Sequence, residues 1–311
     1  MTHRDLLSLA QLPFDARTIR AWLKALRPAS LVIAGFSCFL GVALAWRDGR
    51  GNLLHAVLVL GAGIVLQAGV NLVNDFFEFK QRRVDDAITH LAVFGAERDL
   101  LEWFIFLTGL ACFAVVAPVG LFLAWRTGWP LLALGAFGFV GGYFYTGEPF
   151  NYKRRGLGVV FVFFLMGVLM VAGSYYATAG TLSMVPVWAS IPVSILVSLI
   201  LLTNELRDFE PDTRHGIRTL TVRIGYPAAV GVYLALLVLA YAGPWVLAAF
   251  GLFPWPVLTL AALPFAVAPT VLVLRRSSPR GPLIPLVMLH HLAFGALYCA
   301  AWLAGRPLSS P

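Results

Sequence analysis

The pattern Asn-x-x-x-Asp occurs twice in this chain, so an aspartate stands four positions after an asparagine in each copy. The first pair is Asn71 and Asp75, and the second is Asn204 and Asp208; each stands where a long apolar run gives way to a charged segment. A spacing of four places both side chains on one face of a helix. A carboxylate at membrane depth is costly, so it is a functional-site hypothesis by default. The two pairs together suggest one shared site.

A further carboxylate follows each pair. Glu78 stands three residues beyond Asp75, and Asp212 stands four residues beyond Asp208. These spacings keep the oxygens on one side of a helix or helical turn. Carboxylate and amide oxygens without thiolates or paired histidines suit hard cations, and Mg²⁺ typically takes one or two carboxylates plus substrate phosphates. The pattern therefore predicts a magnesium site.

Basic residues share the charged segments with these acids. One guanidinium group can bind two phosphate oxygens through paired hydrogen bonds, whereas an ammonium group interacts with them as a point charge. Acids and bases together at the membrane surface predict a Mg²⁺-diphosphate site above an apolar cavity, which fits an isoprenyl diphosphate with its long hydrocarbon tail. The basic residues are Lys80, Arg82, Arg83, Arg98, Lys153, Arg154, Arg207, Arg214 and Arg218.

Loss of diphosphate from such a substrate develops an allylic cation, which aromatic faces stabilise. Tyr143, Phe144 and Tyr145 end an apolar run in the middle of the chain. They are candidates for this role, and Tyr145 is taken as a substrate-binding residue. An interfacial aromatic belt is the alternative interpretation of the same residues.

The composition indicates what positions these residues. Of 311 residues, 59% are hydrophobic and only 12% are charged, and the mean hydropathy is +0.82, which is typical of an integral membrane protein. Helices of about 17 to 25 apolar residues span a bilayer. We therefore predict an all-α, polytopic bundle of about nine transmembrane helices, over residues 29–46, 53–74, 103–124, 129–146, 157–178, 184–204, 227–249, 254–274 and 282–304.

The charged residues predict the orientation of this bundle. Residues 1–28 carry several charges and no apolar core, so they are interpreted as a cytoplasmic or interfacial segment rather than a signal peptide, and residues 29–311 as a single transmembrane domain. With the N-terminus in the cytoplasm, nineteen of the 23 Lys and Arg residues face the cytoplasm, as the positive-inside rule requires. Twelve of the fifteen acids lie on the same side, which predicts a cytoplasmic-face site in the cytoplasmic membrane.

Four segments of the chain resemble the UbiA-type membrane prenyltransferases, and within them the 1,4-dihydroxy-2-naphthoate polyprenyltransferases of menaquinone synthesis. The segments are residues 25–28, 67–80, 145–158 and 204–225. The resemblance implies transfer of a prenyl group from an allylic diphosphate to an aromatic acceptor. With naphthoate as acceptor, it implies that carbon–carbon bond formation is accompanied by loss of the carboxylate.

The resemblance also implies roles for particular residues. Asn71, Asp75 and Glu78 correspond to the first metal-diphosphate motif. Asn204, Asp208 and Asp212 correspond to the second. Expected diphosphate contacts are Lys80, Arg82, Lys153, Arg207 and Arg218. A motif carboxylate or the departing diphosphate could each accept a proton.

Some positions differ from the family pattern. Glu78 stands where Asp is usual, which lengthens the reach of the carboxylate by one methylene, and Val159 stands where an acid is common. Residues 80–86 lack the usual glycine. Other acceptors therefore stay open, namely 4-hydroxybenzoate, a chlorin or haem. A different class of function, a cation-coupled secondary transporter, is a further alternative. No nucleic-acid partner and no obligate protein partner is inferred.

Overall fold

The computed structural model describes residues 23, 25–81, 98–276 and 280–305, and every regular element within them is helical. Most of the predicted interfacial segment, residues 1–28, lies outside the described residues. Eight spans are long and apolar enough to cross a membrane, and one further apolar helix, α6, is shorter at 14 residues. The predicted all-α membrane bundle is confirmed, with one of its nine helices below the length that spans a bilayer.

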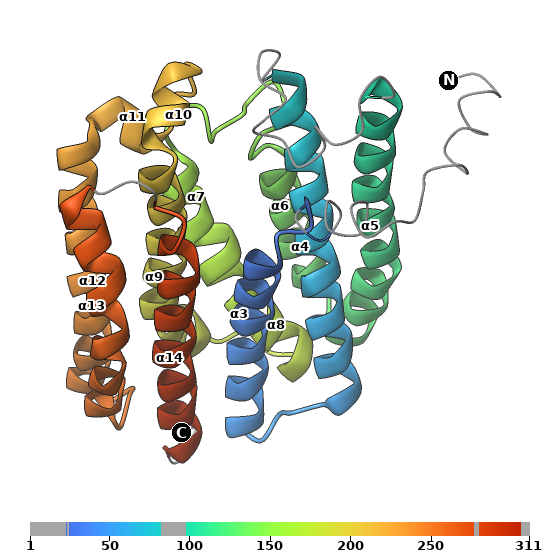
Figure 1. The fold of residues 1–311 in the computed structure, drawn as a ribbon. Helices are drawn as coiled ribbons and strands as arrows, with labels where there is room; N and C mark the ends of the chain where they lie inside the picture. The colour runs from blue at the N-terminus through green and yellow to red at the C-terminus, as the bar shows by residue number, and fades with distance from the viewer. Residues whose placement is uncertain (1–22, 24, 82–97, 277–279, 306–311) are drawn as a thin grey trace.

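The helices run up and down the bundle, and the longest described connection, residues 144–157, joins α6 to α7 (Figure 1). With the short α6 counted as the fourth, the fifth span is interrupted by a π-helix, η2, so it consists of α7, η2 and α8. The bounds are α3 Pro28–Arg47, α4 Leu53–Gln81, α5 Arg98–Thr127, α6 Pro130–Tyr143, α7 Gly158–Val162, η2 Phe163–Leu169, α8 Met170–Ala179, α9 Val185–Arg207, α10 Phe209–Arg214, α11 Leu220–Ile224, α12 Tyr226–Ala249, η3 Pro256–Ala262, α13 Leu263–Arg275 and α14 Leu283–Ala304.

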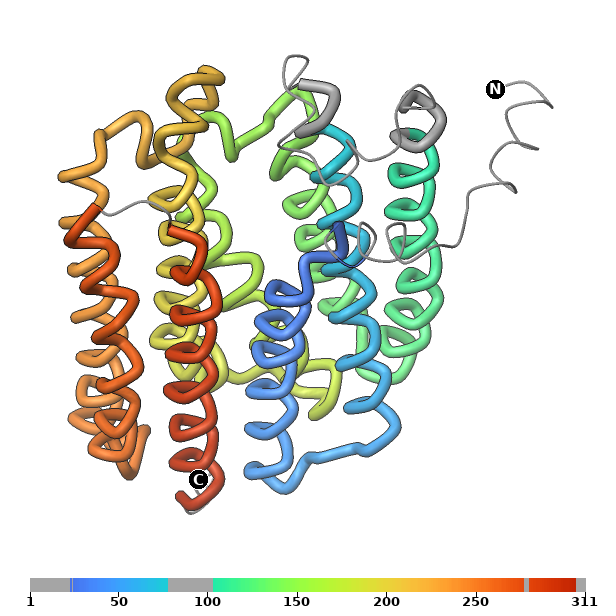
Figure 2. The backbone as a smooth tube through the Cα atoms, in the orientation of Figure 1, coloured from blue at the N-terminus to red at the C-terminus, as the bar shows by residue number. Residues whose placement is uncertain are grey.

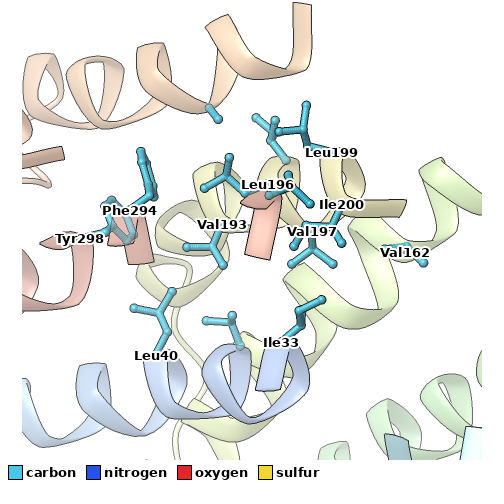
Figure 3. Packing of buried hydrophobic residues seen from close by; sticks show 14 of the residues in the cluster. Ile33, Leu40, Val162, Val193, Leu196, Val197, Leu199, Ile200, Phe294 and Tyr298 are labelled. Carbon is cyan, nitrogen blue, oxygen red and sulfur yellow. The ribbon is translucent and has the colours of Figure 1, made fainter. Parts of the chain in front are cut away.

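Helix α9 forms the centre of the hydrophobic core. Its Val193, Leu196 and Leu199 are at most 1% exposed. Figure 3 shows them in one cluster with Leu40 of α3 and Phe294 of α14. Of the candidate membrane spans in the described part of the chain, α9 is the most enclosed by other helices, with 72% of its 18-residue apolar stretch buried. The core therefore fixes α9, which carries the second acidic motif, relative to α3 and α14.

Glycine allows the closest approaches between these helices. A Cβ atom at Gly41 of α3 would overlap the carbonyl oxygen of Val171 in α8, and one at Gly167 of η2 would overlap the side chain of Ser194 in α9. Within a membrane, small residues let helix backbones pack closely where no hydrophobic effect drives them together. These contacts join the fifth span to both α3 and α9.

Both acidic motifs lie at one end of the bundle. Helices α4 and α9 end there, and α10 and α11 follow α9 at the same end (Figure 2). Arg47, Arg50 and Arg126 stand instead at the connections of the other end. The fold thus separates the charged motifs from the few basic residues predicted on the opposite face.

Candidate active site

A cavity of about 990 Å³ connects the two acidic motifs with the apolar interior. Asp75 and Val59 of α4 both line it; they are sixteen residues apart, so the cavity follows α4 for about 24 Å. Its deep walls are apolar, formed by side chains such as Leu123, Leu134 and Leu169. The residues at its charged end are Arg27, Asn71, Asn74, Asp75, Lys153, Asn204, Glu205, Arg207, Asp208, Asp212, Arg214 and His215.

The first motif occupies the last turns of α4. The amide nitrogen of Asn71 donates to the carbonyl of Leu26 and to the hydroxyl of Ser30, both at 2.7 Å, while its oxygen accepts a hydrogen bond from Gln67 at 3.0 Å. Asn71 is 2% exposed and lines the cavity. These bonds fasten α4 to the start of α3 and so determine where the motif stands.

Asp75 is held by a residue from far away in the sequence. Its carboxylate forms an ion pair with the guanidinium of Arg27, which immediately precedes α3, and its side chain is only 10% exposed. Both residues line the cavity. The tight packing of α3 against α4 therefore places a cation directly on the first motif aspartate.

Asn74, between these motif residues, links α4 to the loop after α6. Its side-chain oxygen accepts a hydrogen bond from the hydroxyl of Thr146 at 2.8 Å, and both residues are at most 3% exposed. A buried bond between residues 72 positions apart orients the whole loop. That loop carries Tyr145 and Lys153, two of the predicted substrate-binding residues.

The second motif lies where α9 passes into α10. Arg207 donates two hydrogen bonds to the carboxylate of Asp208, from Nε to Oδ1 at 2.7 Å and from Nη2 to Oδ2 at 2.6 Å. The backbone NH of Asp212 bonds to the carbonyl of Asp208 at 2.8 Å, so the helical turn continues across the junction. Asn204, Asp208 and Asp212 consequently all face the cavity, as their spacing predicts.

A buried arginine fixes α10. The guanidinium of Arg280 donates to the carbonyl of Leu206 at 2.6 Å and to both carboxylate oxygens of Glu210, at 3.0 and 2.8 Å. Partial burial raises the pKa of Glu210, but the hydrogen bonds and positive charge of Arg280 outweigh it and lower the pKa below the usual range. The loop before α14 therefore holds the end of α9 and the start of α10 together.

The aromatic side of the cavity comes from the loop after α6. Tyr145 is 8% exposed, and the ammonium group of Lys153 lies 5.8 Å from the centre of its ring. Tyr152 donates to the carbonyl of Gly141 at 2.6 Å, and burial, with the nearby Tyr145, raises the pKa of its phenol, which keeps the hydroxyl neutral. An aromatic face beside a cation and two acidic motifs can accommodate a developing carbocation.

Several predicted site residues do not join this arrangement. Arg218 is exposed in the connection before α11 and is not one of the described residues that line the cavity. Glu78 and Lys80 belong to the end of α4, but their side chains lie outside the described part of the structure, and Arg82 lies outside it altogether. Their roles remain predictions.

Sequence reasoning missed three residues of the site. Arg27, Glu205 and Arg280 are not among the catalytic, metal-binding or substrate-binding residues that the sequence predicts. Glu205 carried a usable signal, since it is an acid within the apolar run before Asp208. Nothing local connects Arg280 to α9, because 74 residues separate it from Leu206.

The acidic residues supply oxygen ligands of the kind that a divalent cation prefers, but their side chains do not form a complete coordination site by themselves. Among the described side chains, no three His, Cys, Asp or Glu residues are grouped closely enough to hold an ion. Asp75 and Asp208 each present a carboxylate from a different helix, and in the structure each already carries an arginine cation. Hard oxygen ligands of this kind bind Mg²⁺ when substrate phosphates and water complete its coordination. The donor set therefore fits such an ion.

The fold and the site define a membrane protein built for an amphiphilic anion, with charge at one end of the cavity and apolar walls along the rest. The comparisons agree. The model of the UbiA prenyltransferase family matches residues 34–293. A 1,4-dihydroxy-2-naphthoate octaprenyltransferase from Escherichia coli is 32% identical over 278 residues, covering 84% of this chain and 87% of the relative. One of the same name from Bacillus subtilis is 29% identical over 244 residues, covering 74% and 78%.

A solved structure gives the same fold. It is described as a UbiA homolog from Archaeoglobus fulgidus bound to GPP and Mg²⁺, and it superposes with a TM-score of 0.63 at 15% identity, over 92% of this chain and all of that one. The chain belongs to the UbiA prenyltransferase family. It is a multi-pass membrane prenyltransferase, which confirms the predicted fold, family and enzyme class and leaves the transporter alternative without support.

Proposed function

We propose that this enzyme transfers a polyprenyl group from an allylic prenyl diphosphate to 1,4-dihydroxy-2-naphthoate, in a Mg²⁺-dependent step of menaquinone biosynthesis. The observation that carries the proposal is one cavity that follows α4 for about 24 Å, with Asp75 and Asp208 at its charged end and apolar walls at its deep end. The names of the two bacterial relatives support naphthoate as the acceptor.

The diphosphate occupies the charged end of the cavity. Arg27 and Arg207 exchange their carboxylate partners for phosphate oxygens, which guanidinium groups bind in the same paired geometry. Lys153 adds a further positive charge at the same end. The carboxylates of Asp75 and Asp208, with Glu78 and Asp212, are thereby available for Mg²⁺, which when bound neutralises the leaving diphosphate.

The prenyl tail lies along the apolar wall, which holds the allylic carbon near the motifs. When the carbon–oxygen bond to the diphosphate breaks, the face of Tyr145 stabilises the positive charge on the allylic carbon. A ring carbon of the acceptor then forms the new carbon–carbon bond, and loss of the carboxylate as carbon dioxide restores the aromatic ring. The buried walls exclude water, which would otherwise capture the cation.

The location follows from the charge distribution. Both motifs stand at the end of the bundle that carries most of the basic residues, which supports a cytoplasmic active site, a cytoplasmic N-terminus and insertion in the cytoplasmic membrane. We also propose that residues 29–311 form one transmembrane domain, because α3, α9 and α14 share a single hydrophobic core.

A reconstitution assay tests the proposal. Purified protein in detergent receives geranylgeranyl diphosphate, Mg²⁺ and, in parallel, 1,4-dihydroxy-2-naphthoate, 4-hydroxybenzoate, a chlorin or haem, and products are identified by mass spectrometry. We expect a prenylated naphthol and released diphosphate with the naphthoate alone, loss of activity with EDTA, and recovery with added Mg²⁺. Product with another acceptor and none with naphthoate would refute the acceptor, and full activity in EDTA would refute the metal.

A further inference from the structure

Glu205 is an acid within the active-site cavity to which the two motifs assign no role. It lies near the end of α9, three residues before Asp208, which places it about 4.5 Å deeper along the helix axis. Its side chain is buried, with only 3% exposed, yet it lines the cavity. A buried carboxyl group is costly unless its oxygens are bound.

Among the described residues, a hydrogen-bond partner is found for only one of its two side-chain oxygens. Oε2 accepts a hydrogen bond from the backbone NH of Thr221 at 3.1 Å, and the Thr221 hydroxyl bonds to the backbone carbonyl of Glu205 at 3.3 Å. Oε1 is buried without a hydrogen-bond partner. Oε2 therefore fastens α11 to α9, whereas Oε1 makes no hydrogen bond to the described residues and can accept one.

Oε1 lies on the side of Glu205 that faces Gly158, near Tyr145. A Cβ atom built on Gly158 would lie 3.7 Å from Oε1 and 3.5 Å from the ring of Tyr145. Lys153, whose ammonium lies 5.8 Å from the centre of that ring, acts on Glu205 electrostatically, and so does Asp212. Oε1 thus lies on the same side of Gly158 as the Tyr145 ring, and about one turn below the charged end of the cavity.

We propose that Oε1 of Glu205 accepts a hydrogen bond from a hydroxyl group of the aromatic acceptor, and this rests on the proposed function above. The diphosphate is held at the level of Asp208, so its allylic carbon and the ring that attacks it lie deeper, where Oε1 is. A carboxylate oxygen binds a hydroxyl donor and disfavours a methyl ether or a carbonyl, which have no proton to give. Glu205 therefore selects acceptors in their hydroxylated form and orients them.

The substitution Glu205→Gln tests this proposal, because glutamine has nearly the same size and shape as glutamate. The NH of Thr221 still needs an oxygen, so the glutamine oxygen takes the place of Oε2 and its NH₂ group takes the place of Oε1. The variant thereby presents a donor where the wild type presents an acceptor. We expect the KM for 1,4-dihydroxy-2-naphthoate to rise about 10- to 100-fold, the range for a hydrogen bond to a charged group. The KM for geranylgeranyl diphosphate and the melting temperature should stay unchanged.

A second probe separates recognition from a merely structural role. The compound 1,4-dimethoxy-2-naphthoate has the same ring but no hydroxyl hydrogen, and its inhibition constant against prenyl transfer reports its binding. We expect it to bind E205Q more tightly than wild type, which is opposite in direction to the change for the hydroxylated substrate. Loss of structure would weaken both compounds. Glu148→Gln makes the same chemical change at an exposed position outside the cavity lining and should alter neither constant.

The outcomes distinguish this inference from the proposed function. An active wild type together with an unchanged naphthoate KM in E205Q overturns the role of Glu205 alone. The same holds if both substrates and the dimethoxy compound weaken together, since Glu205 would then serve only to hold Thr221. A wild type that forms no prenylated naphthol overturns the proposed function and this inference with it.

Discussion

Replacing Arg280 by methionine should destabilise the end of α9 through one buried contact. The Arg280 side chain is 4% exposed, and methionine keeps its apolar packing while removing its charge. Loss of the guanidinium leaves the buried carbonyl of Leu206 without its hydrogen-bond donor, which costs about 1–3 kcal/mol. The pair with Glu210 counts as a surface pair of about 0.2–1 kcal/mol, because 47% of the Glu210 side chain is exposed.

Two smaller contributions have opposite signs. The guanidinium lies 4.7 Å from the centre of the Tyr226 ring, a contact worth about 0.5–1 kcal/mol. The Nε atom of Arg280 is buried and has no hydrogen-bond partner among the described residues. Removing this unpaired donor should stabilise the variant by about 1 kcal/mol. The free energy of unfolding should therefore fall by about 1–4 kcal/mol. At about 2 °C per kcal/mol for a chain of this size, the melting temperature should fall by about 2–8 °C.

Arg276→Met is the matched control. Arg276 approaches the same carboxylate, with Nε 3.6 Å from Oε1 of Glu210, but its side chain is 52% exposed. Its guanidinium also lies 4.8 Å from the centre of the Tyr226 ring, so the loss of Arg276 should cost under about 2 kcal/mol and leave no buried carbonyl without its donor. Differential scanning fluorimetry of both variants in one detergent, at one heating rate, makes the comparison. Equal melting temperatures for the two variants, or an R280M value within 1 °C of wild type, would refute the claim that burial of this guanidinium stabilises the second motif.

Three further predictions concern the motifs, pH and packing. Asp75→Asn and Asp208→Asn should each lower prenyl transfer at least about 100-fold with the protein still folded, because each removes a carboxylate from the metal site; near-normal turnover of either would disprove that assignment. Because the pKa of Glu210 is lowered in the folded state, its stabilisation is present above the ordinary pKa of about 4.3 and is lost as pH falls through the folded value. Wild-type melting temperature should thus drop more steeply below about pH 4 than that of Glu210→Gln, and parallel curves would contradict this. Gly167→Ala should cost about 1–3 kcal/mol through overlap with α9, whereas Gly61→Ala, which meets nothing, should cost none, as thermal melts will test.

The sequence alone predicted the bundle and the motif faces because both depend on local geometry. A run of about 20 apolar residues can satisfy its backbone in a membrane only as a helix, so composition and length were sufficient for the spans. The four-residue spacing within each Asn and Asp pair placed their side chains on one face, and Asn71, Asp75, Asn204 and Asp208 all line the cavity. Helix α6 is shorter than predicted because the loop that carries Tyr145 begins within the apolar run.

Tertiary structure decided which partners these residues have. Arg27 reaches Asp75 across 48 positions, Thr146 reaches Asn74 across 72, and Arg280 reaches Leu206 across 74. No spacing rule covers such distances, since they depend on how α3, α4, α9 and α14 pack. The same packing left one oxygen of Glu205 without a donor beside an aromatic wall. The local sequence determined the helices and the faces on which the motif side chains lie, and only the packing of distant helices could decide which of their oxygens have hydrogen-bond partners.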